Sequence, residues 1–159
     1  MAIDKVIVYL QTYGLEDRVR RFSVSSATVA LAAQALGVEE ARIAKTMSFL
    51  AGEQAILVVA AGDVRVDNRK FKDVFHTKAK MMPPERLEAL VGHAMGGVCP
   101  FAVNEGVAVW LDVSLRRFDT VYPAAGDAAS AVELTVPELE ACAKALGWVD
   151  VCKPLTSDC

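Results

Sequence analysis

Long apolar runs are missing from this sequence of 159 residues. The longest, Ala55 to Ala61, has the length of a strand and falls far short of the roughly 20 residues that a membrane-spanning helix needs. The N-terminus also lacks the basic, apolar and small-residue order of an export signal. We therefore expect no membrane segment and a location in the cytoplasm.

Paired cysteines are absent and histidines are few. The four cysteines form no CxxC pair, and the two histidines, His76 and His93, do not join Cys99 in a recognised metal-binding spacing. Without an export signal, reduced thiols are the default state. We therefore expect neither a disulfide framework nor a metal site.

An excess of positive charge is absent as well, because 17 basic and 20 acidic residues give a net charge of −3. A protein that binds nucleic acid only through its phosphates is usually basic, so any such contact here should use a small local patch. The densest basic segment is 65–80, and with Arg18, Arg20 and Arg21 it could border an anionic cleft. The alternative is that these side chains form an ordinary solvated face.

What the sequence does contain is a regular periodicity of apolar residues, 53% of the chain being hydrophobic. Helices are expected at 3–10, 29–36, 67–74, 85–91 and 136–146. Strands are expected at 19–24, 43–50, 55–61, 78–82, 107–113, 118–122, 131–135 and 148–152, with a loose tail at 153–159. The strands are not regularly interleaved with helices. We therefore predict a single α+β domain over residues 1–159, with a mixed, mostly antiparallel, barrel-like sheet flanked by helices.

The most unusual stretch is the glycine loop Gly96-Gly97-Val98-Cys99-Pro100-Phe101, with His93 just before it. Glycine permits left-handed backbone angles and close approach, while proline fixes φ and removes a donor. Such a loop is a place where a substrate could lie against main-chain groups. A second turn-rich loop contains Gly126, and it could face the first if their strands are neighbours.

Lys45 stands at the start of an apolar strand, close to Ile43, Met47 and Phe49. One interpretation is a surface lysine whose stem covers apolar neighbours while its ammonium reaches water. The other is a fixed positive charge aimed into a cleft, where it holds a phosphate, a hydroxyl or a developing oxyanion.

Cys99 and His93 could form a thiol nucleophile and its base, because a thiolate needs a nearby base or a positive field. No third residue that would orient such a pair is evident. A buried, neutral Cys99 is the interpretation that the pattern favours.

In their order along the chain, these elements resemble the YbaK/ProX family of free-standing aminoacyl-tRNA deacylases, relatives of the editing domain of bacterial prolyl-tRNA synthetases. The resemblance covers about residues 20 to 147. It rests on the lysine strand Ile43-Ala44-Lys45-Thr46-Met47-Ser48-Phe49, the segment Val58-Val59-Ala60-Ala61-Gly62-Asp63, the loop from Gly96 to Pro100 that matches a GxxxP pattern, and the helix start Thr135-Val136-Pro137-Glu138-Leu139.

This resemblance implies hydrolysis of the ester between a wrong amino acid and the terminal adenosine of tRNA, with no metal or organic cofactor. Lys45 would be the essential lysine, Gly96 and Pro100 would frame the loop that receives the aminoacyl group, and Gly126 would supply a main-chain contact near the attacked carbonyl. The residues expected to contact the substrate are Thr28, Thr46, His93, Gly97, Val98, Cys99 and Pro100. The acceptor end of an aminoacyl-tRNA would be the partner, and prolyl-tRNA synthetase is a second candidate partner by resemblance.

The sequence departs from the family pattern at two places near the expected site. Position 99 is Cys where a serine or another small residue is common, and Asp127-Ala128-Ala129 stand where basic residues are common. Cysteine, alanine, serine and threonine therefore all stay open as the amino acid. Two other functions also stay open: a non-catalytic module that binds tRNA or a synthetase, and a hydrolase that uses Cys99 and His93.

Overall fold

The structure, a computed structural model, describes residues 2–155. Its helices are α1 Ala2–Gln11, α2 Val29–Leu36, α3 Asn68–Phe75, α4 Pro84–Leu90 and α5 Val136–Ala143. Its strands are β1 Val19–Arg21, β2 Ile43–Ala51, β3 Gln54–Ala61, β4 Val64–Val66, β5 Ala108–Asp112, β6 Thr120–Pro123, β7 Ser130–Val132, β8 Leu134–Thr135, β9 Trp148–Val149 and β10 Cys152–Pro154. This confirms the predicted single α+β domain with a curled mixed sheet.

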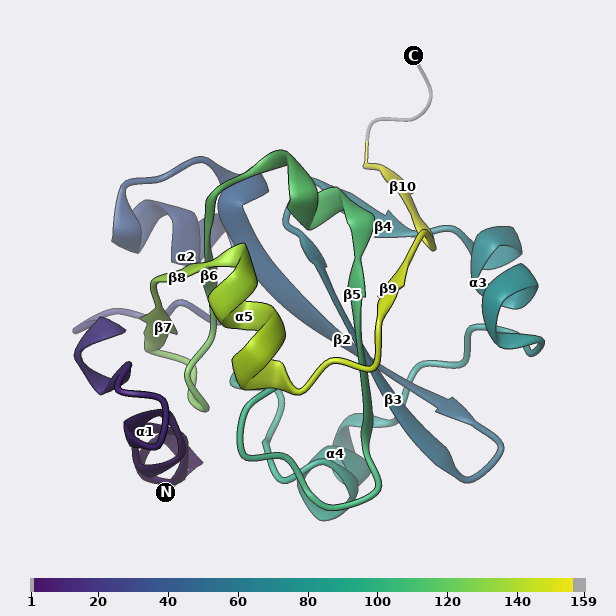
Figure 1. The fold of residues 1–159 in the computed structure, drawn as a ribbon, viewed down its shortest axis with the longest axis horizontal. Helices are drawn as coiled ribbons and strands as arrows, with labels where there is room; N and C mark the ends of the chain where they lie inside the picture. The colour runs from purple at the N-terminus through teal and green to yellow at the C-terminus, as the bar shows by residue number, and fades with distance from the viewer. Residues whose placement is uncertain (1, 156–159) are drawn as a thin grey trace.

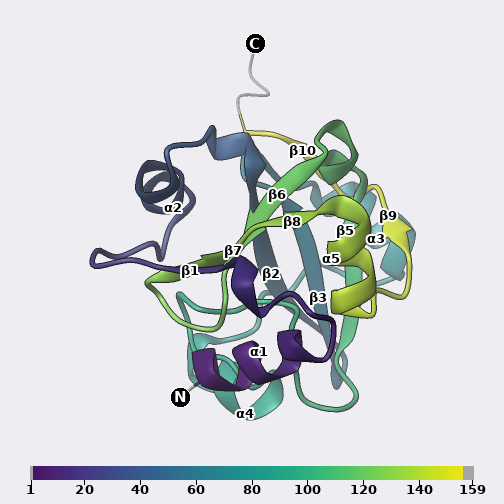
Figure 2. The same ribbon diagram turned by 60° about the vertical axis from the view of Figure 1, so that its left-hand side comes forward.

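The hairpin of β2 and β3 forms the centre of a six-stranded sheet in the order β8-β6-β2-β3-β5-β9. Every residue of β3 from Ala55 to Ala61 is buried, because β2 and β5 flank it and its faces are covered. Figures 1 and 2 show the helices outside the curled sheet, with α2 and α3 on opposite sides of the molecule. Two short ribbons, β1–β7 and β4–β10, complete the fold.

The helix starts follow local signals in the sequence. Thr28, Asp67 and Thr135 each accept a hydrogen bond from a main-chain N–H of the first turn, as N-caps do. The end of α5 differs from the prediction: the helix stops at Ala143 rather than at 146. Lys144 adopts a left-handed conformation, with φ of 49°, and caps the helix there.

Several predicted strands are shorter or divided. Residues 78–82 form no strand but a single bridge, Met81 with Phe49, because Pro83 and Pro84 follow and lack donors. The segment 131–135 divides into β7, which pairs with β1, and β8, which pairs with β6. The segment 148–152 divides into β9 and β10. Ordered pairing also extends beyond 152, since β10 runs to Pro154, whereas 156–159 lie outside the described residues.

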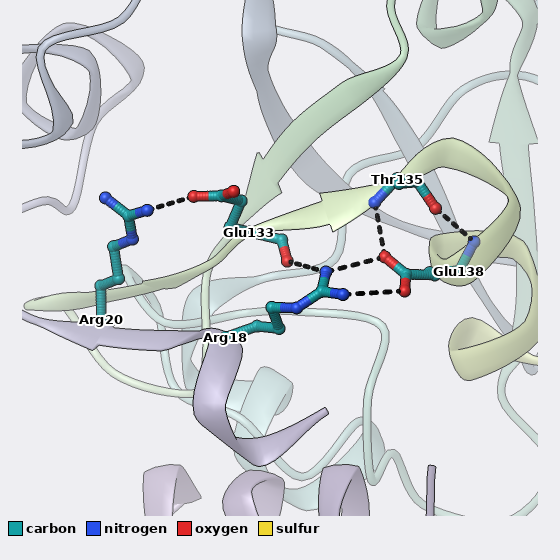
Figure 3. Close-up of polar contacts among 5 residues, drawn as sticks. All are labelled: Arg18, Arg20, Glu133, Thr135 and Glu138. Carbon is teal, nitrogen blue, oxygen red and sulfur yellow. Dashed lines mark hydrogen bonds and ion pairs between the residues drawn. The ribbon is translucent and has the colours of Figure 1, made fainter. Parts of the chain in front are cut away.

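A network of charged groups ties the N-terminal segment to the start of α5 (Figure 3). The Arg18 guanidinium donates to both carboxylate oxygens of Glu138 at 2.9 and 3.2 Å. The same carboxylate accepts the Thr135 N–H at 2.9 Å, and the Thr135 hydroxyl accepts the Glu138 N–H at 3.2 Å. The Thr135 N–H first, and Arg18 after it, hold the pKa of Glu138 below its ordinary value.

The neighbouring arginines are also paired. Arg20 forms an ion pair with Glu133, and Arg21 lies 3.5 Å from the Asp4 carboxylate. The basic face predicted at Arg18, Arg20 and Arg21 therefore supplies no uncompensated charge for an anionic ligand.

Replacing Thr135 by alanine removes the hydroxyl that caps α5 and should lower the free energy of unfolding by about 1 kcal/mol. Urea denaturation of Thr135→Ala measures this loss. The control is Thr77→Ala, because the Thr77 side chain makes no hydrogen bond within residues 2–155, and its unfolding midpoint should stay near that of the wild type. Equal midpoints for the two variants would show that the cap contributes nothing.

Candidate functional site

One edge of β2 is covered by two different partners that leave a gap between them. β6 runs parallel to β2 and pairs only with Ile43 and Ala44. Further along the same edge, Leu50 donates its N–H to Lys80 at 2.9 Å, and the Ser48 carbonyl accepts from Met82 at 3.0 Å. The intervening residues 45–47 have no strand partner on this edge within the described chain.

The main chain of Thr46 faces this gap. Backbone groups of an antiparallel strand alternate between its two edges. Ser48 and Leu50 direct theirs to the gapped edge, so Thr46, two residues before Ser48, does the same. Its side-chain Oγ1 is buried and makes no hydrogen bond. The gap therefore offers main-chain and hydroxyl groups that the fold leaves available.

A cavity of about 280 Å³ lies over the gap. Its polar wall is formed by Ser26, Thr28, Lys45, Thr46, Ser48, Tyr122 and Ser130. Its apolar wall includes every methionine within residues 2–155: Met47, Met81, Met82 and Met95. This methionine wall could not be predicted from the sequence, because Met81, Met82 and Met95 lie outside the helices and strands and only the fold brings them to Met47.

The structure places half of the expected site residues in this cavity. Five residues line it: Thr28, Lys45, Thr46, Gly96 and Val98. His93, Cys99 and Pro100 are buried but do not line it. Gly97 and Gly126 do not line it either, although their sequence neighbours Gly96, Val98 and Ala124 do.

The two glycine loops pack directly against each other. A Cβ atom on Gly97 would lie 2.6 Å from the Asp127 Cα and 2.8 Å from the Gly126 carbonyl carbon, closer than real side chains come. Gly96 and Gly126 have φ of 90° and 104°, angles that favour glycine. The Asp127 carboxylate turns back to accept the Ala129 N–H at 2.9 Å, so it stabilises its own loop and does not line the cavity.

Lys45 is half-buried, and its ammonium donates to the Val64 carbonyl. Burial lowers its pKa below the ordinary lysine value, while Cys152 and Asp63 act in the opposite direction. It forms no ion pair within residues 2–155, because the Asp63 carboxylate is held by Arg117 at 2.6 and 3.0 Å. The charge of Lys45 is therefore available to an anionic ligand.

The neighbourhood of Cys99 argues against a thiol nucleophile. His93 Nε2 lies 2.7 Å from the Phe101 carbonyl, which can only accept, so Nε2 carries the proton and cannot take one from Cys99. The Cys99 sulfur is fully buried, and burial raises the pKa of its thiol to about 12. The arrangement is that of a neutral buried thiol beside a structural histidine.

Native protein should therefore react slowly with iodoacetamide at Cys99. At pH 7.5 and under native conditions we expect no alkylation of Cys99, Cys142 or Cys152, because all three are buried. Peptide mapping by mass spectrometry measures each site separately, and urea-unfolded protein is the positive control. Rapid native labelling of Cys99 would contradict the assignment.

Few side chains in the cavity could act as an acid, a base, a nucleophile or a metal ligand. Among its lining residues only Lys45 and Tyr122 carry titratable side chains, and no group of three metal-binding side chains occurs in the described part of the chain. Chemistry in this cavity must use main-chain groups, hydroxyls and one ammonium. Within residues 2–155, no helix is both long and apolar enough to cross a membrane.

Fold and cavity together give an α+β domain whose candidate ligand site is built from main-chain groups, hydroxyls and the half-buried ammonium of Lys45. A family model described as an aminoacyl-tRNA editing domain matches residues 24–142. The chain belongs to this family.

Three individual proteins are similar to the chain over nearly its whole length. The chain is 46% identical over 154 residues to the uncharacterized protein YwhH of Bacillus subtilis (strain 168), covering 96% of this chain and 98% of that protein. It is similar to the crystal structure of "a putative trans-editing enzyme for prolyl tRNA synthetase", with 29% identity, a TM-score of 0.86 and coverage of 96% and 97% of the two chains. The hypothetical protein APE2540 gives 28% identity, a TM-score of 0.84 and coverage of 94% and 99%.

A methyl group at Gly97 should separate the two glycine loops, because main chain lies on both sides of the contact. In Gly97→Ala we expect large changes in the amide NMR shifts of residues 126–129. The matched control is Gly14→Ala, where the added Cβ meets nothing within 4 Å and only backbone strain is introduced. Unchanged shifts in Gly97→Ala would mean that the loops do not depend on this contact.

Proposed function

We propose that this protein hydrolyses the ester bond between a small amino acid and the terminal adenosine of a mischarged tRNA. The observation that carries the proposal is that Lys45 and Gly96 line the same cavity, beside the unpaired edge of β2. Membership of the editing-domain family supports an ester of this kind as the substrate.

The reaction adds water across an ester that is already activated. The water oxygen bonds to the carbonyl carbon, and the bond from that carbon to the ribose oxygen breaks. One proton of the water goes to the ribose oxygen and the other to solvent as the carboxylate of the amino acid forms. Positioning the water and stabilising the oxyanion are the tasks left to the protein, and main-chain donors can do both.

Lys45 holds the ribose or the terminal phosphate as a fixed positive charge. Its partly buried position strengthens that interaction, because a charge in a less polar surrounding is screened less. The loops at Gly96 and Gly126 bring main-chain groups toward the carbonyl. Gly97, Val98, Thr28 and Thr46 shape or line the space for the amino acid.

Cys99, His93 and Pro100 support the loop from behind and do not touch the amino acid, since they are buried outside the cavity. The departure at position 99 therefore does not by itself alter the substrate. We expect a small amino acid, and alanine, cysteine, serine and threonine are the candidates. We place the activity in the cytoplasm, with prolyl-tRNA synthetase as a partner that the likeness to the neighbouring trans-editing structure suggests.

Deacylation of tRNA carrying Ala, Cys, Ser, Thr or Pro tests this function. Wild-type protein should release at least one of the small amino acids, and Lys45→Met should slow that release by about 100-fold, the effect of losing one group that stabilises the transition state. Methionine keeps the apolar stem, so packing is preserved. Lys144→Met is the control, because Lys144 lies on the α5 end over Tyr9 and outside the cavity.

Two results would overturn the proposal. Equal rates of amino-acid release by Lys45→Met and wild type would show that Lys45 takes no part in the reaction. Tight binding without release for every tRNA in the panel would favour the non-catalytic binding module.

A further inference from the structure

A second hollow adjoins the candidate active-site cavity. It has a volume of about 270 Å³, and its walls are Met47, Phe49, Arg65, Val66, Asn68, Ala79 and Met81. Met47 and Met81 line both spaces, so these two side chains form the partition between them. A ligand that extends from the first cavity past this partition enters the second.

Lys45 lies at the side of the first cavity that faces the hollow. Its ammonium donates to the carbonyl of Val64, and the next residue along β4 is Arg65, a wall of the hollow. A ribose or phosphate held by Lys45 would therefore have its remaining parts beside Arg65. We place the amino acid in the first cavity. The nucleoside attached to it then extends past Lys45, and the second hollow offers space on that side.

The charges around the hollow lack partners. Arg65 lines it, Lys78 and Lys80 flank its residue Ala79, and Arg69 follows its residue Asn68; all four basic side chains are exposed. Within residues 2–155 none of them forms an ion pair. By contrast, Arg18, Arg20 and Arg21 are each paired with a carboxylate. Arg65 is thus an unpaired basic wall of the second hollow, and three further unpaired basic residues adjoin its wall residues in the sequence.

The walls of the hollow match a nucleobase. Met47 and Met81 offer apolar and polarisable surfaces against which a flat ring can pack, while the Phe49 side chain is only 2% exposed and belongs to the core. The exposed amide of Asn68 makes no side-chain hydrogen bond in the described structure, and it carries both a donor and an acceptor, as the edge of an adenine requires. A guanidinium such as that of Arg65 can stack on a base or bind its phosphate.

We infer that the second hollow binds the nucleobase of the ester-bearing nucleoside, with Asn68 on the base edge and Arg65 and its basic neighbours on the adjoining phosphate. This inference rests on the proposed function for the position of the ester. It gives the unpaired Arg65, which lines the hollow, a phosphate to bind.

The test compares two esters of the amino acid that wild-type protein releases best: the methyl ester, which lacks a nucleoside, and the adenosine 3′-ester. Asn68→Ala should lower kcat/KM for the adenosine ester about tenfold, the size of one good base contact, and leave the methyl ester unchanged. Lys144→Gln, which removes a charge elsewhere, should change neither. Equal losses on both esters, or no loss on either, would overturn the inference.

Binding gives a second readout that does not need catalysis. The uncharged trinucleotide 5′-CCA-3′, titrated by NMR, should shift amides near Asn68 and Ala79, and Arg65→Gln should weaken its Kd several-fold. If this binding is found while no ester is hydrolysed, the hollow stands and the proposed function fails. The opposite result is that esters are hydrolysed, that Lys45→Met slows this hydrolysis, and that the trinucleotide does not shift these amides. In that case the proposed function stands and the assignment of the hollow is wrong.

Discussion

The unpaired stretch of β2 is the constraint from which the candidate site follows. A strand inside a protein normally pairs along both edges, because a buried main-chain donor or acceptor without a hydrogen-bond partner costs free energy. Here β6 covers one end and the segment around Met81 covers the other, so residues 45–47 stay open. The cavity lies over that gap, and both Lys45 and the glycine loop at Gly96 line it.

The contact between the two glycine loops gives the gap its opposite wall. Gly97 lets the main chain of one loop touch the main chain of Gly126 and Asp127 in the other, with no side chain between them. The surrounding core then isolates His93 and Cys99 from the cavity. As a result the site has one ammonium and many main-chain groups, a composition suited to stabilising charge rather than to forming a covalent intermediate.

Local signals made much of the fold predictable. The caps at Thr28, Asp67 and Thr135 fix helix starts, because each side chain bonds its own first turn. The hairpin of β2 and β3 was readable from a short turn between apolar runs. The end of α5 at Lys144 was not, since no sequence rule places a lysine in a left-handed cap.

Features that depend on distant pairing were harder to predict. The segment 78–82 resembles a short strand, but it forms only one bridge with β2 before two prolines follow. Lys45 and Gly96 could be singled out separately from the sequence, and only the fold brings them to one cavity. The pairing of Arg18 with Glu138 joins segments 120 residues apart, and no local pattern predicts it.

A crystal structure with an amide-linked alanyl-adenosine analogue, which cannot be hydrolysed, tests the central claim most directly. The account predicts the analogue's carbonyl in the cavity between residues 45–47 of β2 and Gly96, with the Lys45 ammonium on its ribose. An analogue bound elsewhere, or one whose carbonyl contacts neither the β2 edge nor the Gly96 loop, would contradict it.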